Sequence, residues 1–411
     1  MNKIFLLINN IKYAIVELFQ KKDPEIVVID SWFGQKFADN SRYLYQYLFA
    51  NKEKLGLKHV VWVTRDEKIN YELNSMGYEC YMLNSKESVH YHKKAYYHIC
   101  NNAPVDSGVC KGELLGKYSF RSRRINLWHG TGVIKTFNMA SNEYKQKVER
   151  HPFLYKVKNV IYSYCSVYRK IFDCIGGWGD CYFLTTSESE CEKFRKCYPL
   201  PYKKFIISNY PRNSSCIKLL KKEEEIVGLL KMFKTSILYL PTFRSSESKF
   251  NYTLVAESMK KTLKEKNILF IQKSHSADKM KSDEYSFEDN ILNLGSNFDI
   301  NILTPLVTFV MTDYSSILAD ALYHYKPIIL YVPDYSEYMN SDRGFSVDAE
   351  YLLSAGKKFF DLNSLNKFIE ENYNTPNNGK TDNYNDIRLK IWGNENKKID
   401  QIWNDIVAQT K

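Results

Sequence analysis

Apolar and polar stretches succeed one another along this chain in a way that predicts alternating strands and helices. The clearest example begins with an apolar run at 306–311, which is typical of a buried strand. A polar turn follows at 312–316, then a helix at 317–325 and a second apolar strand at 327–332. Strand, turn, helix and strand in this order predict a right-handed βαβ unit of an α/β fold.

The predicted helix at 317–325 has two unlike faces. Its apolar residues fall on one face at helical spacing, and we expect that face to pack on the sheet: Ile317, Leu318, Ala321, Leu322 and Tyr325. Asp313, Ser316 and Asp320 fall on the other side. We expect these three residues to face solvent or a cleft.

The turn before this helix offers hydroxyls and a carboxylate, from Thr312, Asp313, Ser315 and Ser316. The first amide groups of a helix lack partners and carry partial positive charge. At the carboxyl end of a parallel strand, such a turn suits a phosphate or a ribose. A turn that only caps the helix is the alternative interpretation, and the local sequence does not separate the two.

The same alternation covers most of the chain. Strands are predicted at 25–30, 59–64, 78–83, 96–101, 124–128 and 180–185, and in 205–213, where the strand runs into a turn. Further strands are predicted in 236–244, which ends in a turn, at 268–275 and at 290–294. The charged segment at 218–234 separates these two series. We therefore predict an N-terminal helix over 1–22, a Rossmann-like domain over 23–220 and a second Rossmann-like domain over 221–411.

The first residues of the chain predict an amphipathic helix. Isoleucines and a leucine form one stripe at helical spacing: Ile4, Ile8, Ile11, Ile15 and Leu18. Lys3, Lys12, Lys21 and Lys22 add positive charge. A helix lying in the interface of an anionic membrane fits this pattern, and a helix docked on its own domain fits it as well. No run of about 18 apolar residues predicts a helix that spans a bilayer.

Charge and cysteine content narrow the class of partner. Lys and Arg number 58 against 47 Asp and Glu, and the formal charge of +11 over 411 residues favours anionic partners. Nucleic acid is the weakest of these, because no RGG, zinc-finger or aromatic RNA-binding motif is found. The nine cysteines are odd in number and lack CxxC pairs, so we expect reduced thiols in a cytoplasmic protein.

Two motifs of the first domain carry candidate chemistry. His129, Gly130 and Thr131 follow a predicted strand, and an imidazole at that position can act as a general base near neutral pH. A histidine that is only hydrogen-bonded within a turn is the alternative. Arg212 follows Pro211 in a second turn and is a candidate anion contact, or else a surface arginine.

In the second half, four turns carry residues that suit phosphate. They contain Thr242 and Arg244, Lys273 and His275, residues 312–316, and Asp342 and Arg343. The first three follow predicted strands and should meet at one edge of a parallel sheet. Cationic and hydroxyl side chains together suit a diphosphate, and acidic metal triads of the DxD type do not stand out. We infer a nucleotide-diphosphate site in the C-terminal domain, facing a histidine-bearing first domain across a cleft.

These motifs, in this order, resemble the CDP-glycerol glycerophosphotransferase family, the teichoic-acid-type polyol-phosphate primases and polymerases. The resemblance covers roughly residues 120–345. It rests on 127–131 (LWHGT) with Lys135, 209–213 (NYPRN), 239–244 (YLPTFR), 271–275 (IQKSH), 312–316 (TDYSS) with Asp320, 326–331 (KPIILY) with Asp334 and Tyr338, and 343–345 (RGF).

The resemblance implies a GT-B-like pair of Rossmann-like domains, with the acceptor on the N-terminal and the nucleotide donor on the C-terminal domain. It implies a peripheral enzyme on the cytoplasmic face of a bacterial membrane. The expected reaction moves a polyol phosphate, glycerol phosphate in the first place, from a CDP-linked donor to a lipid-linked, membrane-anchored acceptor, with release of CMP and without a metal or other cofactor. A CDP-ribitol ribitolphosphotransferase and a nucleotide-sugar glycosyltransferase of the same architecture are the alternatives.

Carried onto this sequence, the resemblance implies that His129 is the base on the acceptor side. It implies that His275 contacts or protonates the phosphates of the donor. It also implies a set of substrate-binding residues: Gly130, Thr131, Lys135, Arg212, Thr242, Arg244, Lys273, Thr312, Asp313, Ser315, Ser316, Asp320 and Arg343. The sequence departs from the family pattern at Ser274 and Ser276, where the family usually has prolines beside the second histidine.

Overall fold

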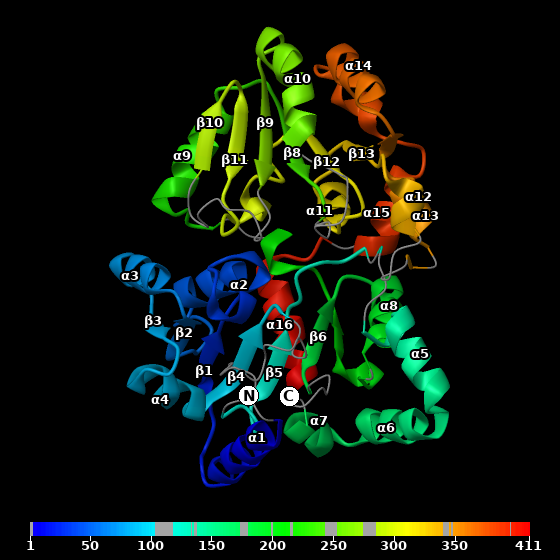
Figure 1. Cartoon of the computed structure of the whole chain (residues 1–411). Helices are drawn as coiled ribbons and strands as arrows, with labels where there is room; N and C mark the ends of the chain where they lie inside the picture. Colours follow the sequence, from blue (N-terminus) through cyan, green and yellow to red (C-terminus); the bar gives the residue numbers. More distant parts are fainter. Residues whose placement is uncertain are drawn as a thin grey trace. The chain divides into compact units, whose positions relative to one another are not determined.

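The computed structural model describes residues 3–102, 118–132, 134, 138–172, 180–198, 200–213, 217–242, 253–273, 285–339, 345–346, 348–394 and 396–411. The chain forms two compact units. Unit 1 comprises Met1–His129, Tyr144–Lys218 and Glu395–Lys411, and unit 2 comprises Gly130–Glu143 and Leu219–Asn394. Figure 1 shows the elements of each unit in sequence colours.

Unit 1 is built on a parallel sheet, which has seven strands within the described residues, in the order β3-β2-β1-β4-β5-β6-β7. Its inner strands are apolar and β-branched, as in the run from Val27 to Ile29, which is fully buried. The strands are β1 (Asp23–Ile29), β2 (His59–Thr64), β3 (Cys80–Met82), β4 (Ala95–Cys100), β5 (Arg123–Asn126), β6 (Tyr182–Thr185) and β7 (Phe205–Ile207).

Helices flank this sheet and follow its strands. They are α1 (Lys3–Leu18), α2 (Asp39–Ala50), α3 (Glu67–Ser75), α4 (Lys86–Lys94), α5 (Asn142–Arg150), α6 (Pro152–Tyr164), α7 (Ser166–Phe172), α8 (Glu188–Cys197) and α16 (Ile399–Thr410), with the 3-10 turns η1 (Trp32–Gly34), η4 (Tyr202–Lys204) and η5 (Pro211–Asn213). Side-chain caps mark several starts, such as Asp66, which accepts from the Lys68 and Ile69 amides of α3. Among the described helices, none is long and apolar enough to cross a membrane.

The C-terminal helix α16 corrects the predicted domain limits. The sequence placed residues 221–411 in one domain, whereas α16 packs against β7 and α2 of unit 1 (Figure 1). The ring of Trp403 meets that of Tyr97 edge-on at 5.3 Å, and Ser208 Oγ donates to the Asp405 carboxylate at 2.6 Å. The apolar face of α16 thus completes the core of unit 1. The sequence of this helix carries no local signal that it packs on the sheet of unit 1 and not on that of unit 2, which precedes it in the chain.

Unit 2 holds a second sheet, with seven strands among the described residues in the order β10-β11-β9-β8-β12-β13-β14, parallel except for β10. The strands are β8 (Thr235–Leu240), β9 (Ile268–Lys273), β10 (Tyr285–Glu288), β11 (Ile291–Leu294), β12 (Phe309–Thr312), β13 (Ile328–Tyr331) and β14 (Lys357–Phe359). All residues of β8, β12 and β13 are buried, because helices cover both faces of the sheet.

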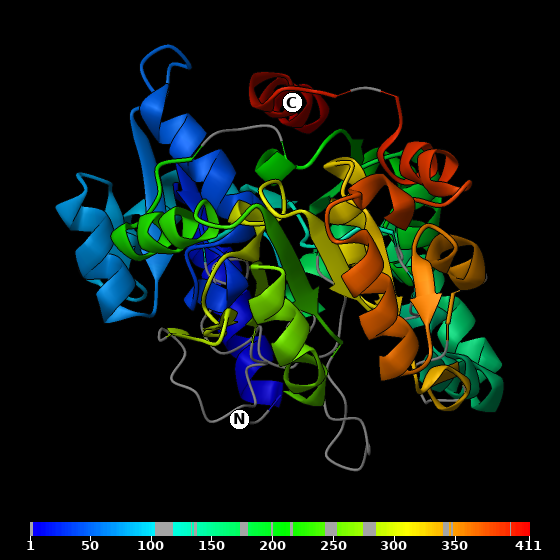
Figure 2. The ribbon, with the colours of Figure 1, turned by 90° about the horizontal axis from the view of Figure 1, so that it is seen from above.

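The helices of unit 2 supply its core. They are α9 (Lys221–Leu230), α10 (Thr253–Glu265), α11 (Ile317–Tyr323), α12 (Tyr335–Met339), α13 (Ala349–Leu353), α14 (Leu362–Asn372) and α15 (Tyr384–Trp392), with the 3-10 turns η6 (Ile300–Ile302) and η7 (Pro376–Gly379). Figures 1 and 2 show α10 and α14 side by side, and their apolar residues pack on the sheet around Phe270 and Met311. The predicted α/β class with two Rossmann-like domains is confirmed, while the cleft between them stays a prediction.

Candidate functional site

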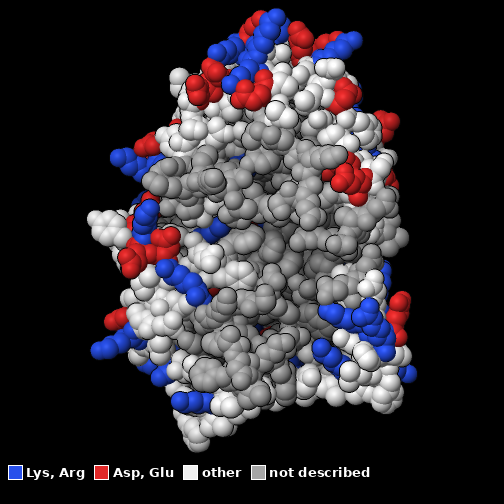
Figure 3. All heavy atoms as spheres, in the orientation of Figure 1, with Lys and Arg blue, Asp and Glu red and all other residues white. Residues whose placement is uncertain are grey.

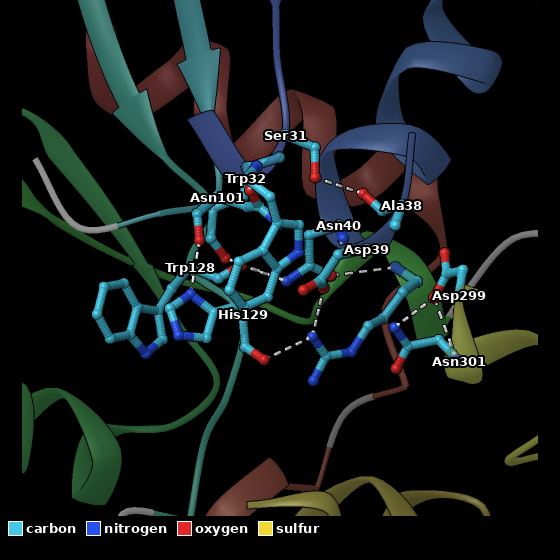
Figure 4. A network of polar contacts seen from close by, with 12 residues as sticks. Ser31, Trp32, Ala38, Asp39, Asn40, Asn101, Trp128, His129, Asp299 and Asn301 are labelled. Carbon is cyan, nitrogen blue, oxygen red and sulfur yellow. Dashed lines mark hydrogen bonds and ion pairs between the residues drawn. The ribbon is translucent and has the colours of Figure 1, made fainter. Parts of the chain in front are cut away.

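The candidate catalytic histidine lies at the point where the strand order of unit 1 reverses. The chain builds outward from β1 to β3 on one side and from β4 to β7 on the other. Open α/β sheets bind ligands outside the carboxyl ends of their strands at such a point. Trp32 follows β1, Asn101 follows β4 and His129 follows β5, so the topology brings three distant loops to one edge of the sheet (Figure 4).

A hydrogen bond fixes the tautomer of His129. Its Nδ1 lies 2.8 Å from the carbonyl oxygen of Asn101. A carbonyl can only accept, so Nδ1 carries a proton, and the neutral form of this ring has its lone pair at Nε2. The side chain of Asn101 also accepts from the backbone N–H of Trp32 at 3.0 Å. Asn101 therefore holds both the imidazole of His129 and the main chain of Trp32.

Two tryptophans flank the half-buried imidazole (Figure 4). Trp128 is stacked on it with ring centroids 4.3 Å apart and an interplanar angle of 28°. Trp32 contacts it at 4.8 Å and 41°. These indoles restrict the ring to one orientation and lower the local polarity around it. The arrangement suits a base that receives a proton from a hydroxyl group.

The backbone around His129 is unusual. Trp32, Phe33, Asp39 and Trp128 all have left-handed φ angles, of 48°, 60°, 63° and 54°. Each such residue costs about 1–3 kcal/mol, and conformations of this kind persist where the surroundings hold them. They are typical of active sites, so the strain at this sheet edge supports the assignment of a functional site.

Arg212, predicted as an anion contact, lies inside unit 1. Its side chain is 5% exposed, and its Nη1 donates to Asp39 Oδ1 at 2.5 Å and to the carbonyl of His129 at 3.0 Å. The guanidinium charge of Arg212 is thus paired with the carboxylate of Asp39 inside the protein. The structure thus connects Arg212 to His129 through the main chain.

The turn after His129 requires its glycines. A Cβ at Gly130 would stand 2.9 Å from Ser316 Oγ, and one at Gly132, whose φ is +64°, would stand 3.0 Å from Ala319 Cβ. Thr131 between them is buried. Gly130 and Ser316, which the sequence predicted separately, therefore lie together in unit 2. Lys135 falls outside the described residues.

The strand order of unit 2 reverses between β8 and β12. The Asp313 carboxylate bridges this point, because it accepts from the backbone N–H of Thr242 at 2.9 and 3.0 Å and from that of Tyr314. Thr312 Oγ1 donates to the Leu240 carbonyl at 2.7 Å. The side chains of Thr312 and Asp313 thus hold the segments that follow β8 and β12 next to each other.

One part of the sequence prediction was wrong. Asp313 and Asp320 were expected to face solvent or a cleft, yet they are 0% and 4% exposed, whereas Ser316 is exposed as expected. The sequence prediction missed α15, which packs on α11: Trp392 Nε1 donates to the Ala319 carbonyl at 2.7 Å. Because α15 packs there, the side of α11 that carries Asp320 is covered by protein. The helix ends at Tyr323, two residues before its predicted end.

The predicted convergence in unit 2 is confirmed for the described residues. Lys273 ends β9, Thr242 follows β8 and the 312–316 turn follows β12, on adjacent parallel strands. The Lys273 ammonium donates to the Phe298 carbonyl at 2.7 Å. Arg244, His275 and Arg343 fall outside the described residues. Within the part of the chain that is described, no group of three or more His, Cys, Asp or Glu side chains could hold a metal ion.

Several residues of these sites escaped the sequence analysis. Asp39, Asn40, Asn101 and Trp32 belong to unit 1, and their only sequence signal is a position just after a predicted strand or before a helix. In unit 2, by contrast, the sequence motifs already held the residues that meet: the Tyr314 ring is stacked on Tyr338 at 4.2 Å and its hydroxyl donates to Asp334 at 3.1 Å.

Comparison with known proteins agrees with the sequence motifs. Residues 12–390 match the family described as CDP-Glycerol:Poly(glycerophosphate) glycerophosphotransferase. The chain is 24% identical to the teichoic acid poly(glycerol phosphate) polymerase of Bacillus spizizenii over 412 residues, which is 96% of each chain. It is also 24% identical to the teichoic acid glycerol-phosphate primase of Bacillus subtilis over 299 residues, 72% of each.

The fold has a solved counterpart. The wall teichoic acid polymerase TagF superposes with a TM-score of 0.67 at 17% identity, over 100% of this chain and 99% of that one. The likeness extends over the whole chain and shows the fold. The family match makes this protein an enzyme of the glycerophosphotransferase type. The chain belongs to the CDP-glycerol:poly(glycerophosphate) glycerophosphotransferase family.

Proposed function

We propose that this enzyme transfers glycerol phosphate from CDP-glycerol to a hydroxyl of a membrane-linked glycan or teichoic-acid-type acceptor and releases CMP. The observation that carries the proposal is the orientation of His129, whose Nδ1–H donates to the Asn101 carbonyl at the switch point of unit 1. The relative that matches 96% of the chain is named a teichoic acid poly(glycerol phosphate) polymerase, which favours glycerol over ribitol as the polyol.

The reaction places clear demands on the protein. The acceptor oxygen attacks the β-phosphorus, a new P–O bond forms, and the P–O bond to CMP breaks as CMP leaves with the electron pair. His129 Nε2 takes the hydroxyl proton, and donors around the phosphates stabilise the charge that develops. His275 would contact or protonate the donor phosphates in this scheme.

In unit 2, we assign donor binding to the edge formed by β9, β8 and β12. Ser315 and Ser316 supply hydroxyls, and α11 is a short helix whose dipole adds little, so the hydroxyls and cations carry the interaction. Lys273, Arg244 and Arg343 supply positive charge. Thr312 and Asp313 shape the loops, because their side chains bind the main chain at Leu240 and Thr242.

Transfer without a metal follows from the same scheme, in which protein cations and hydroxyls neutralise the diphosphate. The direct test is turnover in excess EDTA, with the rate compared before and after Mg²⁺ is restored. A rate that falls in EDTA and recovers with Mg²⁺ would overturn this part of the proposal.

We further propose that unit 1 binds the cytoplasmic face of an anionic membrane. Its support is an apolar surface on α1 and α6, both of which contact α7 (Figure 1). The exposed residues are Ile8, Ile11, Ile15 and Leu18 of α1, Phe153, Leu154, Val157, Val160, Ile161 and Tyr164 of α6, and Val167 of α7. Basic side chains lie at the lower right of Figure 3, in the region of α5 and α6. Apolar residues beside positive charge suit an interfacial helix surface.

The two interpretations of the N-terminal helix are then compatible. Arg121 donates to the carbonyls of Glu17, Leu18 and Gln20, and its own N–H donates to the Glu17 carboxylate at 2.8 Å. The ammonium Nζ of Lys22 lies 3.4 Å from Oε1 of the Glu17 carboxylate. The end of α1 is therefore docked on unit 1 while its isoleucine stripe stays exposed.

The proposed function is tested with a panel of CDP-glycerol, CDP-ribitol and UDP-sugars, an acceptor lipid in vesicles, and chromatography of the released nucleotide. We expect CMP with CDP-glycerol and extension of the acceptor by glycerol phosphate. Release of UDP would favour the glycosyltransferase alternative, and transfer from CDP-ribitol alone would change the polyol. Product length then separates a primase from a polymerase.

A further inference from the structure

Three consecutive carbonyl groups of the segment that carries His129 accept hydrogen bonds from side chains. The amide Nδ2 of Asn40 donates to the carbonyls of Leu127 at 3.2 Å and Trp128 at 2.9 Å. Nη1 of Arg212 donates to the carbonyl of His129 at 3.0 Å. These donors lie 83 to 88 positions away in the sequence, so the tertiary fold, and not the local turn, determines the path of this segment.

The donors also hold one another. Asp39 Oδ1 accepts from Arg212 Nη1 at 2.5 Å and from the Asn40 N–H at 2.8 Å, and Asn40 Oδ1 accepts from the Arg212 N–H at 3.3 Å. The exposed fractions of Asp39, Asn40 and Arg212 are 5%, 0% and 5%. Buried charges are costly unless they are paired, so this closed network favours a single arrangement.

Trp128 shows why such support is needed. Its φ of 54° is disfavoured for a side chain of this size, and it directly precedes His129. A strained residue relaxes when the groups that hold it are removed. Relaxation at Trp128 would rotate the following peptide and displace the imidazole.

We propose that Asp39, Asn40 and Arg212 are positioning residues that set where His129 presents Nε2 to the acceptor hydroxyl. We call them the carbonyl clamp. The proposal rests on the role of His129 as the base in the proposed function. It gives Arg212 a different part from the anion contact that the sequence predicted, because its guanidinium bonds inward and lies 4.9 Å from the Tyr210 ring.

The test begins with Asn40→Asp, which keeps the shape of the side chain and removes both N–H donors. A displacement of about 1 Å costs a reaction roughly 100-fold, so we expect kcat to fall by about that factor. The KM for CDP-glycerol should stay within about twofold, because the donor site is not touched. Asn51→Asp is the matched control: it removes one amide bond, to the Tyr47 carbonyl at 2.8 Å, at the other end of α2, and kcat should not change.

The decisive measurement combines Asn40→Asp with His129→Ala. If the clamp acts through His129, the double variant is no slower than His129→Ala alone, because the base is already absent. Losses that multiply would show that Asn40 acts on something other than His129 and would overturn the proposal. Full turnover by His129→Ala alone would instead overturn the proposed function, so the two failures are distinct.

Arg212→Lys provides a second route, should Asn40→Asp fail to fold. Lysine keeps the positive charge but cannot bond both Asp39 and the His129 carbonyl in the same geometry. We expect kcat to fall at least tenfold with an unchanged KM for CDP-glycerol. A higher KM with unchanged kcat would restore the anion-contact role and contradict the clamp.

Discussion

The Nδ1 atom of His129 and the carbonyl oxygen of Asn101 lie 2.8 Å apart, at the ends of two adjacent parallel strands. This contact assigns the proton to Nδ1 and the basic lone pair to Nε2. The main-chain carbonyl accepts the hydrogen bond and so orients the imidazole without the help of a charged side chain. The fold itself, through β4 and β5, thus supplies the orientation that other enzymes obtain from a carboxylate.

Replacing His129 with alanine should remove the base and nearly abolish CMP release. General bases contribute about 10²- to 10⁴-fold, so we expect a loss of kcat in that range. The measurement is CMP release from CDP-glycerol with acceptor present, together with circular dichroism to confirm the fold. His151→Ala, at an exposed histidine before α6, is the control. Equal rates for the two variants would rule out His129 as the base.

The sequence predicted this site in part, and the reason lies in which signals are local. His129 stood out because a glycine-rich turn follows an apolar strand, and both features are read within ten residues. The carbonyl clamp gave no such signal, because Asp39 and Arg212 are 173 positions apart and meet only when the sheet forms. Polar pairs of this kind have no periodicity.

Unit 2 shows the same division. The βαβ unit around 306–334 was predicted from its apolar runs, and β12, α11 and β13 confirm it within a few residues. The burial of Asp320 was missed, since it depends on α15, which arrives from 61 residues beyond the end of α11 at the nearest. The sequence analysis predicted no element at α15 (Tyr384–Trp392), so this contact could not be anticipated.

Asp313→Asn should weaken donor binding and stability together. The carboxylate accepts from the Thr242 amide with both oxygens, and asparagine presents one oxygen and an NH₂ group that clashes with that donor. A buried donor left unsatisfied costs about 1–3 kcal/mol. Urea unfolding should show this loss, and the KM for CDP-glycerol should rise as the loops after β8 and β12 move.

Asp289→Asn is the matched control for this experiment. Asp289 pairs with Lys264 at 2.6 Å, but both side chains are solvent-accessible, so the loss of this pair should change stability little. If Asp313→Asn were as mild as this control in both measurements, the bridge across the switch point of unit 2 would have no energetic importance.

Lys170 makes stability depend on pH on the alkaline side. Burial, aided by the nearby charge of Arg124 and opposed by that of Asp180, lowers the pKa of Lys170 from 10.5 to about 8. Between these values the unfolded chain holds a proton that the folded chain has released. The free energy of unfolding therefore gains up to about 1.4 kcal/mol for each pH unit from about 8 to 10.5.

Lys170→Met should lose this gain. Urea unfolding of both proteins at several pH values measures it, and above pH 8 the free energy of unfolding of the native protein should rise relative to that of the variant. Below that pH, the difference should not vary. Lys261→Met, at a lysine whose side chain is 86% exposed, is the control. Curves for Lys170→Met that run parallel to the native curve would contradict the prediction.

Charges placed in the isoleucine stripe of α1 should weaken membrane binding without affecting the fold. Ile11 and Ile15 are 40% and 53% exposed, so glutamates at both positions remain solvated in the free protein. On a membrane, each substitution would remove up to about 1.5–3 kcal/mol that the buried isoleucine side chain contributes, and the added carboxylates would repel anionic lipid. Vesicle co-sedimentation should show at least tenfold weaker binding.

The same variant separates docking from chemistry. Turnover on a short soluble acceptor should match that of the native protein, because α1 leads into the amino end of β1, whereas His129 follows the carboxyl end of β5 in the same parallel sheet. Met232→Glu, at a methionine that is 75% exposed in unit 2, controls for the added charge and should bind vesicles normally. Since the attraction is partly electrostatic, native binding should also weaken as salt rises from 0.05 to about 0.5 M. Equal loss of vesicle binding and soluble turnover would mean that α1 supports the fold of unit 1 instead of the membrane contact.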